Sequence, residues 1–254
     1  QLWHVGRMSD PEIIGETPVS ASAVKAAGHV SLLRPKRDYV TPRALDVAEI
    51  KKIIADYKHA AVLANQAGFD AVELHAANGY LVEQFLFSNT NQRQDQYGGS
   101  IENRARFLLE VVDALIEACG AGRVGVHLSP RALSHDMLDD NRVALFSYVV
   151  EQLNLRKIAF IFSREHLAED SMGPMLRQKF DGAWIANESL DFDSAQQLLA
   201  DNAVDAVAFG LAYIANPDLL QRFQENAALN ELNPTTLYAD SAEGYTDYPT
   251  LAEA

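Results

Sequence analysis

The sequence contains a single cysteine, Cys119, so an internal disulfide is excluded, and this scarcity is typical of a reducing compartment such as the cytoplasm. Positive charge is also scarce: 21 Lys and Arg residues stand against 35 Asp and Glu residues, for a formal net charge of −14. Nucleic-acid binding depends on clustered Lys and Arg, so this balance argues against such a partner. No apolar run approaches the roughly 18 residues of a membrane span. We therefore expect a cytoplasmic protein with neither a nucleic-acid nor a membrane partner.

Metal-binding motifs are missing too. The sequence has no C-x-x-C, no H-E-x-x-H and no calcium-loop spacing, so we expect no metal site. What the sequence does have is material for a large core, since 48% of its residues are hydrophobic. That content excludes the composition of a disordered chain.

Short apolar segments alternate with segments of helical periodicity along most of the chain. Asp46 and Glu49 form a capping-box pattern ahead of one helix, and Ser100 can cap another. Further helical periods lie at 145–153 and 195–199. Six segments are expected to be strands: Gln1–Gly6, Phe69–Leu74, Arg123–Leu128, Ile158–Phe162, Ala183–Ala186 and Ala206–Phe209. The segment from His75 to Gly99 is expected to be a loop, and the acidic cluster Asp136, Asp139 and Asp140 a solvated one.

This alternation predicts an α/β protein with a parallel sheet. A doubly wound sheet and a (β/α)8 TIM barrel both satisfy the pattern. The absence of a G-x-x-x-x-G-K-[ST] loop lowers the first option. With six strands instead of eight, a barrel would be incomplete and would leave two open edges.

The chemistry-bearing residues concentrate in the segment His75-Ala-Ala-Asn78-Gly-Tyr80, directly after a predicted strand. Parallel barrels carry their functional groups at the carboxyl ends of the strands. A neutral His and an Asn amide can each donate a hydrogen bond to one substrate oxygen. The phenol of Tyr80 can deliver a proton to a developing carbanion. From spacing alone, a structural interpretation stays open, in which His75 and Asn78 cap the loop and Tyr80 packs.

A longer stretch carries a resemblance. The run from His75-Ala-Ala-Asn78-Gly-Tyr80-Leu-Val-Glu-Gln-Phe-Leu through Asn91-x-Arg93-x-Asp95-x-Tyr97-Gly-Gly-Ser-Ile-Glu-Asn-Arg is similar to the old yellow enzyme family. Within that family it is most similar to the N-ethylmaleimide reductase and xenobiotic reductase branch. Gln1-Leu-Trp3-His-Val-Gly-Arg7, Ala215-Asn-Pro-Asp-Leu and Gly244-Tyr-Thr-Asp-Tyr-Pro249 match the same family, so the resemblance covers essentially the whole chain.

The resemblance implies an eight-stranded barrel that binds FMN at its carboxyl-end mouth and takes a hydride from NADPH or NADH. It implies that His75 and Asn78 bind the substrate's electron-withdrawing oxygen and that Tyr80 is the proton donor. Trp3 would line the substrate side. Residues matched to the flavin are Gln1, His127 and Tyr238, and those matched to its phosphate are Asn187, Gly210 and Leu211.

Two positions depart from the family pattern. His127 stands where the family carries Arg against the flavin, and a His is only partly charged near pH 7. Leu211 stands where the phosphate turn usually carries Arg. The match to the family begins near the family's third barrel strand. About the first hundred residues of the family pattern therefore have no counterpart in this sequence.

The resemblance therefore implies a single FMN-binding barrel domain over residues 1–254, truncated at its N-terminus relative to the family. The implied function is reduction of activated alkenes, such as α,β-unsaturated carbonyls and maleimides, or of nitro compounds. The implied partner is a small electrophilic substrate, and association through the open barrel edges is expected. The alternative is a flavin-free, catalytically inactive truncated paralogue or fragment of the same fold.

Overall fold

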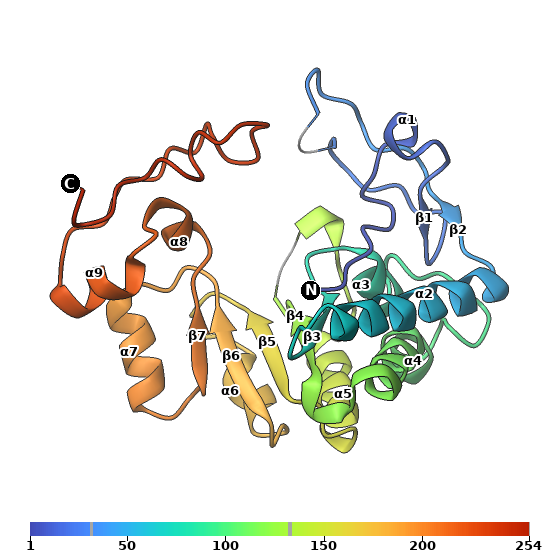
Figure 1. Ribbon diagram of the computed structural model, residues 1–254. Coiled ribbons are helices and arrows are strands. Elements are labelled where there is room, and N and C mark those ends of the chain that lie inside the picture. Colours follow the sequence, from blue (N-terminus) through green and yellow to red (C-terminus); the bar gives the residue numbers. More distant parts are fainter. Residues whose placement is uncertain (31–32, 132–133, 254) are drawn as a thin grey trace.

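A parallel β-sheet, or strand wall, forms the centre of the computed structural model (Figure 1). The structure describes residues 1–30, 33–131 and 134–253. Five strands are hydrogen-bonded in the order of the sequence, so each is separated from the next by a helical connection. They are β3 (Val72–Ala76), β4 (Val124–Leu128), β5 (Phe160–Arg164), β6 (Ala183–Asn187) and β7 (Ala206–Ala208). This arrangement confirms the predicted parallel α/β fold.

The chain's first residues continue the wall on the other side of β3. Leu2 pairs with Leu74 as a parallel bridge: its N–H donates to the Glu73 carbonyl at 2.7 Å, and its carbonyl accepts from the His75 N–H at 2.9 Å. Six parallel segments thus follow one another, as predicted, although three of them, β3, β4 and β5, start later than the sequence suggested. Residues 69–71 lie outside β3, with Phe69 exposed, and β5 begins at Phe160.

Helices cover the outer side of this wall (Figure 1). Asp46 caps α2 (Val47–Gln66) through the predicted capping box with Glu49, and the Ser100 hydroxyl accepts from the Asn103 N–H ahead of α4 (Ile101–Cys119). The other long helices are α5 (Arg142–Leu155) and α7 (Phe192–Ala200). Shorter helices are α6 (Gly173–Arg177), α8 (Leu211–Ala215), α9 (Leu219–Glu225) and the 3-10 turns Ala121–Arg123 and Ser134–Asp136. None of the helices in the described ranges has the length and apolarity that a membrane crossing needs.

Alternate strand residues face opposite sides of the wall. Leu74, Val126 and Ile161 point outward into the core beneath the helices and are fully buried. Their neighbours His75, His127 and Phe162 lie at matching register positions of three adjacent strands and face the inner side. The strand pattern therefore gathers polar side chains at the inner face, near the carboxyl ends of β3 and β4.

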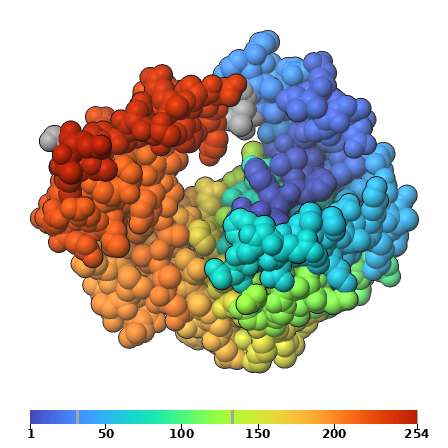
Figure 2. Space-filling view, viewed as in Figure 1, coloured from blue at the N-terminus to red at the C-terminus, as the bar shows by residue number. Residues whose placement is uncertain are grey.

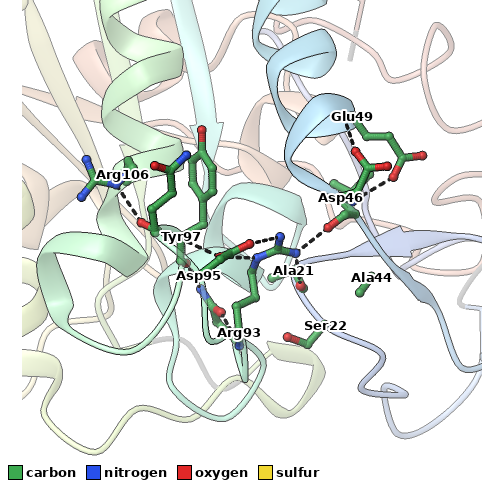
Figure 3. Close-up of polar contacts among 12 residues, drawn as sticks. Ala21, Ser22, Ala44, Asp46, Glu49, Arg93, Asp95, Tyr97 and Arg106 are labelled. Atoms are coloured by element: carbon green, nitrogen blue, oxygen red, sulfur yellow. Dashed lines mark hydrogen bonds and ion pairs between the residues drawn. The ribbon is translucent and has the colours of Figure 1, made fainter.

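The stretch between Pro11 and Ala44 folds back onto the loop that follows β3. It contains α1 (Pro11–Ile14) and the short parallel pair β1 (Val19–Ser20) and β2 (Arg43–Ala44). The nearly buried guanidinium of Arg93 donates to the carbonyls of Ala21 at 2.9 Å and Leu45 at 2.6 Å, and pairs with Asp95 (Figure 3). Arg93 thereby holds the N-terminal stretch against the loop.

Two expectations for irregular segments were wrong. The predicted loop 75–99 contains the helix α3 (Leu81–Leu86), all six residues of which are buried. Of the acidic cluster expected to be solvated, Asp136 and Asp140 are exposed, but the Asp139 side chain is buried, because it forms an ion pair with Arg104 and accepts a hydrogen bond from the Ser88 N–H. Both errors have one cause: tertiary contacts supplied partners that local sequence does not reveal.

The two ends of the chain lie on either side of a central hollow. Figure 2 shows the C-terminal residues in red and the N-terminal residues in blue around an incomplete ring. Among the described residues, β7 pairs only with β6, and Leu2 pairs only with β3. The predicted open edges are therefore present. Association through them stays a prediction.

Candidate active site

The end of β3 and the loop after it carry three of the predicted residues. His75 is the fourth residue of β3, Asn78 adopts the left-handed conformation with φ 58°, and Tyr80 is the N-cap residue of α3. Asn tolerates this conformation better than most residues because its short polar side chain bonds locally. Trp3 packs edge-on against both rings, with centroids 5.4 Å from His75 and 4.7 Å from Tyr80. The structure thus brings Trp3, His75 and Tyr80 together, with Asn78 on the same loop.

Arg164 fixes the amide of Asn78. The last residue of β5 donates from Nη1 to the Asn78 Oδ1 at 2.6 Å, while its Nη2 lies 3.0 Å from Glu188, just beyond β6. Since Oδ1 is the acceptor, the amide must present its Nδ2 donor elsewhere. Sequence reasoning missed Arg164 and Glu188. The available signal was a charged residue ending an apolar strand at its carboxyl end.

A buried carboxyl group holds the loop after β3 through hydrogen bonds. Glu83 of α3 accepts from the Gly79 N–H at 2.5 Å and from the Ser129 hydroxyl at 2.7 Å. Burial raises the pKa of Glu83 to about 7, against the opposing effect of these hydrogen bonds. Glu83 was also missed, although a carboxylate within an apolar helical run is a signal for such a partner. Its hydrogen bonds tie the loop after β3 to Ser129, which directly follows β4.

We predict that Glu83→Gln changes how stability depends on pH. The unfolded carboxyl ionises near pH 4.5, whereas the folded one keeps its proton until about pH 7. The unfolded state therefore releases its proton first, and wild-type stability falls as the pH rises through this interval. The variant lacks this titration, so its free energy of unfolding should gain roughly 3 kcal/mol on wild type, at about 1.4 kcal/mol per pKa unit. Urea unfolding of both proteins across this range measures the gain, and parallel curves would contradict it.

His127 lies directly beside His75. The two residues are register partners on β3 and β4, and their Nδ1 atoms are 3.0 Å apart. Burial lowers the pKa of His75 to about 4, and the charge of Arg164 lowers it further. Burial also lowers the pKa of His127 to about 3, with smaller lowering effects of His75 and Arg164. Both imidazoles are therefore neutral at pH 7. The Nε2 of His127 is buried without a hydrogen-bond partner in the described part of the chain.

Gln1 completes this cluster. Its side-chain amide donates to Glu73 and lies 3.4 Å from the His127 Nδ1. Burial raises the pKa of Glu73, and the Gln1 contact opposes this change. Gln1 and His127 therefore share one polar network with His75, on the inner face of the strands.

The residues matched to a phosphate lie at the ends of β6 and β7. Asn187 donates from Nδ2 to the Ala208 carbonyl at 2.8 Å, Gly210 precedes α8, and Leu211 is 58% exposed. Glu188 and Ser189 both have positive φ, at 98° and 56°. A carboxylate thus follows Asn187 directly, and Arg164 is its ion-pair partner.

Tyr238 stands apart from the central cluster in the C-terminal segment. Its ring is 74% exposed, and its backbone N–H donates to the Tyr245 hydroxyl at 2.6 Å. Tyr238 nevertheless affects Tyr80 electrostatically. Burial is the largest cause that raises the pKa of Tyr80, and the phenols of Tyr39 and Tyr238 raise it further. The charge of Arg164 lowers this pKa and so opposes them. The Tyr80 phenol therefore keeps its proton at neutral pH, as a proton donor must.

Comparisons with known proteins agree with this geometry. The sequence profile of the family described as NADH:flavin oxidoreductase / NADH oxidase matches residues 1–230. The chain is 41% identical over 267 residues to 12-oxophytodienoate reductase 1 of Oryza sativa subsp. japonica, and the match covers 100% of this chain and 69% of that relative.

Two solved structures superpose closely on the chain. Morphinone reductase in complex with tetrahydroNAD has a TM-score of 0.93 at 46% identity, over 99% of this chain and 72% of that one. An old yellow enzyme homologue from Zymomonas mobilis has a TM-score of 0.94 at 38% identity, over 98% of this chain and 72% of that one. These matches confirm the predicted barrel fold over the part that the chain shares with them.

Proposed function

Because the chain belongs to the NADH:flavin oxidoreductase / NADH oxidase family, and within it to the old yellow enzymes, we propose that it is an FMN-dependent reductase of activated alkenes or nitro compounds, with NAD(P)H as reductant. The observation that carries the proposal is the convergence of His75, Asn78 and Tyr80 at the carboxyl end of β3, with Arg164 orienting the Asn78 amide. Polarising groups and a protonated phenol at one mouth suit reduction of an electrophilic double bond.

The residues present fit FMN. His127 has a buried Nε2 without a partner among the described residues, and the Gln1 amide beside it can donate or accept. We propose that Gln1 and His127 hold the flavin ring, that Tyr238 packs beside it, and that Asn187, Gly210 and Leu211 hold its phosphate. Bound FMN would supply the hydride, which the protein residues cannot supply themselves.

The remaining steps belong to this chain's side chains. The Asn78 amide, held by Arg164, donates to the substrate oxygen, and His75 contacts the same oxygen. Their hydrogen bonds draw electron density from the double bond. Tyr80 gives its phenolic proton to the carbon next to the polarised group, and Trp3 lines the space that the substrate enters. Contact with these two rings would help to fix the substrate's orientation.

A flavin-free, inactive protein of the same fold is the second candidate, and Glu188 favours it. This carboxylate follows Asn187, where the first candidate needs a site for an anionic phosphate. Its ion pair with Arg164 offsets the charge only in part, since a partly exposed pair is screened by solvent. Apolar Leu211 likewise supplies no positive charge there, and neutral His127 supplies none beside the proposed site of the flavin ring.

FMN binding separates the two candidates. We predict that the chain, refolded or expressed with excess FMN, retains a yellow flavin whose absorbance is bleached by NADPH or NADH and restored by 2-cyclohexenone or a maleimide. His127→Arg should tighten FMN binding, because a permanent charge would face the electron-rich edge of the ring. A second variant, Glu188→Gln, should also tighten binding by removing the carboxylate near the proposed site of the phosphate. A colourless protein in all three cases would support the flavin-free candidate.

A further inference from the structure

A cavity opens on the outer side of the strand wall, between the strands β5 and β6 and the helices α6 and α7. This outer cavity has a volume of about 410 Å³, within the range of roughly 300–1,000 Å³ that is typical of small-molecule sites. Ser163, in its wall, is the register partner of Ala186 and of the fully buried Leu128. Successive strand residues face opposite sides, so Ser163 points away from the inner face on which Phe162 and His127 lie. The outer cavity is therefore separate from the candidate active site.

The length of α6 explains why the space is open. This helix has five residues, whereas α4 and α5 have 19 and 14. Five residues span about 7.5 Å in a helix and about 16 Å in a strand, so α6 cannot cover strands of its own residue count. Its first residue, Gly173, brings no side chain into the space. The outer faces of β5 and β6 are therefore left partly uncovered between α6 and α7.

The walls of the outer cavity are mostly apolar. Trp184 of β6 is only 2% exposed overall, so the cavity reaches into the core and is more than a surface groove. The other apolar side chains that line it come from both helices and from the segments next to them: Leu167, Pro174, Ala186, Leu198 and Val204. Such walls favour the apolar body of a small molecule, because its burial removes apolar surface from water.

The two ionisable side chains of the lining already have partners. Glu165 accepts from two backbone N–H groups, both at 2.7 Å, and its Oε1 lies 3.6 Å from the Arg131 Nε. Arg177 forms an ion pair with Asp205 at 3.1 Å. A charged ligand would lose its hydration and would meet no unpaired opposite charge on these two residues. The outer cavity therefore favours a neutral ligand.

Two polar groups of the lining have no hydrogen-bond partner in the described ranges. They are the hydroxyl of Ser163, a residue that is 3% exposed, and the buried Nε of Arg177. A buried polar group without a partner is unfavourable, so a ligand that pairs with it gains affinity. No contact holds the Ser163 hydroxyl in one rotamer, and rotation about its Cα–Cβ bond can turn it toward the cavity. Both groups can donate, so the complementary ligand atom is a neutral acceptor.

We propose that the outer cavity binds a small, mostly apolar molecule with a neutral carbonyl oxygen, which accepts a hydrogen bond from Ser163. The apolar body packs against Trp184 and Leu198, and the carbonyl faces the carboxyl end of β5. No flavin and no residue of the candidate active site takes part, so this binding is independent of whether the protein is a reductase.

Camphor, a rigid saturated ketone without a carbon–carbon double bond, is a suitable probe. The chain has two tryptophans, so Trp3→Phe leaves Trp184 in the cavity wall as the sole indole fluorophore. We expect camphor to change the emission of Trp184 saturably, with a Kd below about 1 mM. The titration uses the protein without added FMN. A Trp184 emission that camphor leaves unchanged would overturn the proposal.

Substitutions in the wall locate the bound camphor by calorimetry. Ser163→Ala should weaken binding about fivefold, as expected for the loss of one neutral hydrogen bond. Ala186→Leu should abolish binding by filling the space, and Ala183→Leu, the same change on the same strand at a residue outside the lining, should leave it intact. Ser163→Ala removes a single oxygen atom, so it tests the site even if Ala186→Leu fails to fold. Wild-type affinity in Ser163→Ala would contradict the assigned hydrogen bond.

Camphor-10-sulfonate tests the preference for a neutral ligand. It keeps the cage and the ketone of camphor and adds a permanent negative charge. We expect it to bind at least about tenfold more weakly than camphor, because the cavity offers the charge no unpaired partner. Binding as tight as that of camphor would contradict the proposed selectivity and would show that Arg177 leaves Asp205 to pair with an anion.

Discussion

Tyr80→Phe is expected to leave reduction of FMN by NADPH nearly unchanged and to slow the reduction of an activated alkene by roughly 10²–10⁴-fold. The substitution keeps the ring that packs between Trp3 and His135 and removes only the phenolic proton. Hydride delivery to the flavin needs no proton from this residue, whereas the carbanion formed from the alkene does. Burial keeps the pKa of Tyr80 above its ordinary value, so the wild-type phenol is protonated throughout the neutral range.

Stopped-flow spectrophotometry separates the two half-reactions, with flavin absorbance as the signal for each. Tyr148→Phe is the matched control, because it removes a phenol from α5, which covers the outer side of the strand wall, away from the candidate site. Both half-reactions of that control should proceed at nearly the wild-type rate. If Tyr80→Phe slows the two half-reactions equally, Tyr80 shapes the mouth by packing and another group supplies the proton.

Periodicity was sufficient to predict the strand wall. Fully buried outward residues such as Leu74, Val126 and Ile161 make the strands recognisable as short apolar runs, and the intervening helices carry their own caps. The ends of the strands were less certain, since apolar residues also occur in turns. Phe69 is apolar but exposed, and it lies ahead of β3. Its apolar character therefore led to a predicted strand that begins too early.

The sequence could predict the parts of the site that share one loop, but not the contacts that come from other elements. His75, Asn78 and Tyr80 share one loop, and a strand-end motif was enough to place them together. The partners that determine their chemistry come from other elements: Arg164 from β5 reaches Asn78, and His127 from β4 reaches His75. Spacing within one loop cannot indicate which distant side chain will occupy a carbonyl oxygen or a ring nitrogen. The donor or acceptor character of each group therefore required the structure.

Helix α3 shows the same limit for secondary structure. Tyr80 caps it without a side-chain hydrogen bond, and it ends after six residues, so neither a cap nor a long period marks it in the sequence. Its stability comes from complete burial and from the contacts of Glu83 with Gly79 and Ser129. A helix this short is marginal without tertiary packing.

Removal of the Asn78 side chain should have the other large effect. Asn78→Gly keeps a residue that tolerates the left-handed backbone at φ 58° and deletes the amide donor. Loss of one preorganised donor to a developing oxyanion should lower kcat for alkene reduction by about 10²–10³-fold, or about 2.7–4 kcal/mol. Flavin reduction by NADPH should change little, since that step develops no charge on the substrate oxygen. Steady-state and single-turnover kinetics with 2-cyclohexenone measure both quantities.

Arg164→Met provides the decisive comparison for this role. Without the guanidinium, the Asn78 amide loses the 2.6 Å hydrogen bond to its Oδ1, on which the proposed orientation of its Nδ2 depends. We expect a smaller loss in kcat, about tenfold, which corresponds to about 1.4 kcal/mol and to one modest hydrogen bond. If Arg164 acts only through Asn78, the double variant should be no slower than Asn78→Gly alone, because groups that act as a unit are not additive. Additive losses would instead show that Arg164 contacts the substrate or flavin directly, and orientation of the amide would then rest on the loop alone.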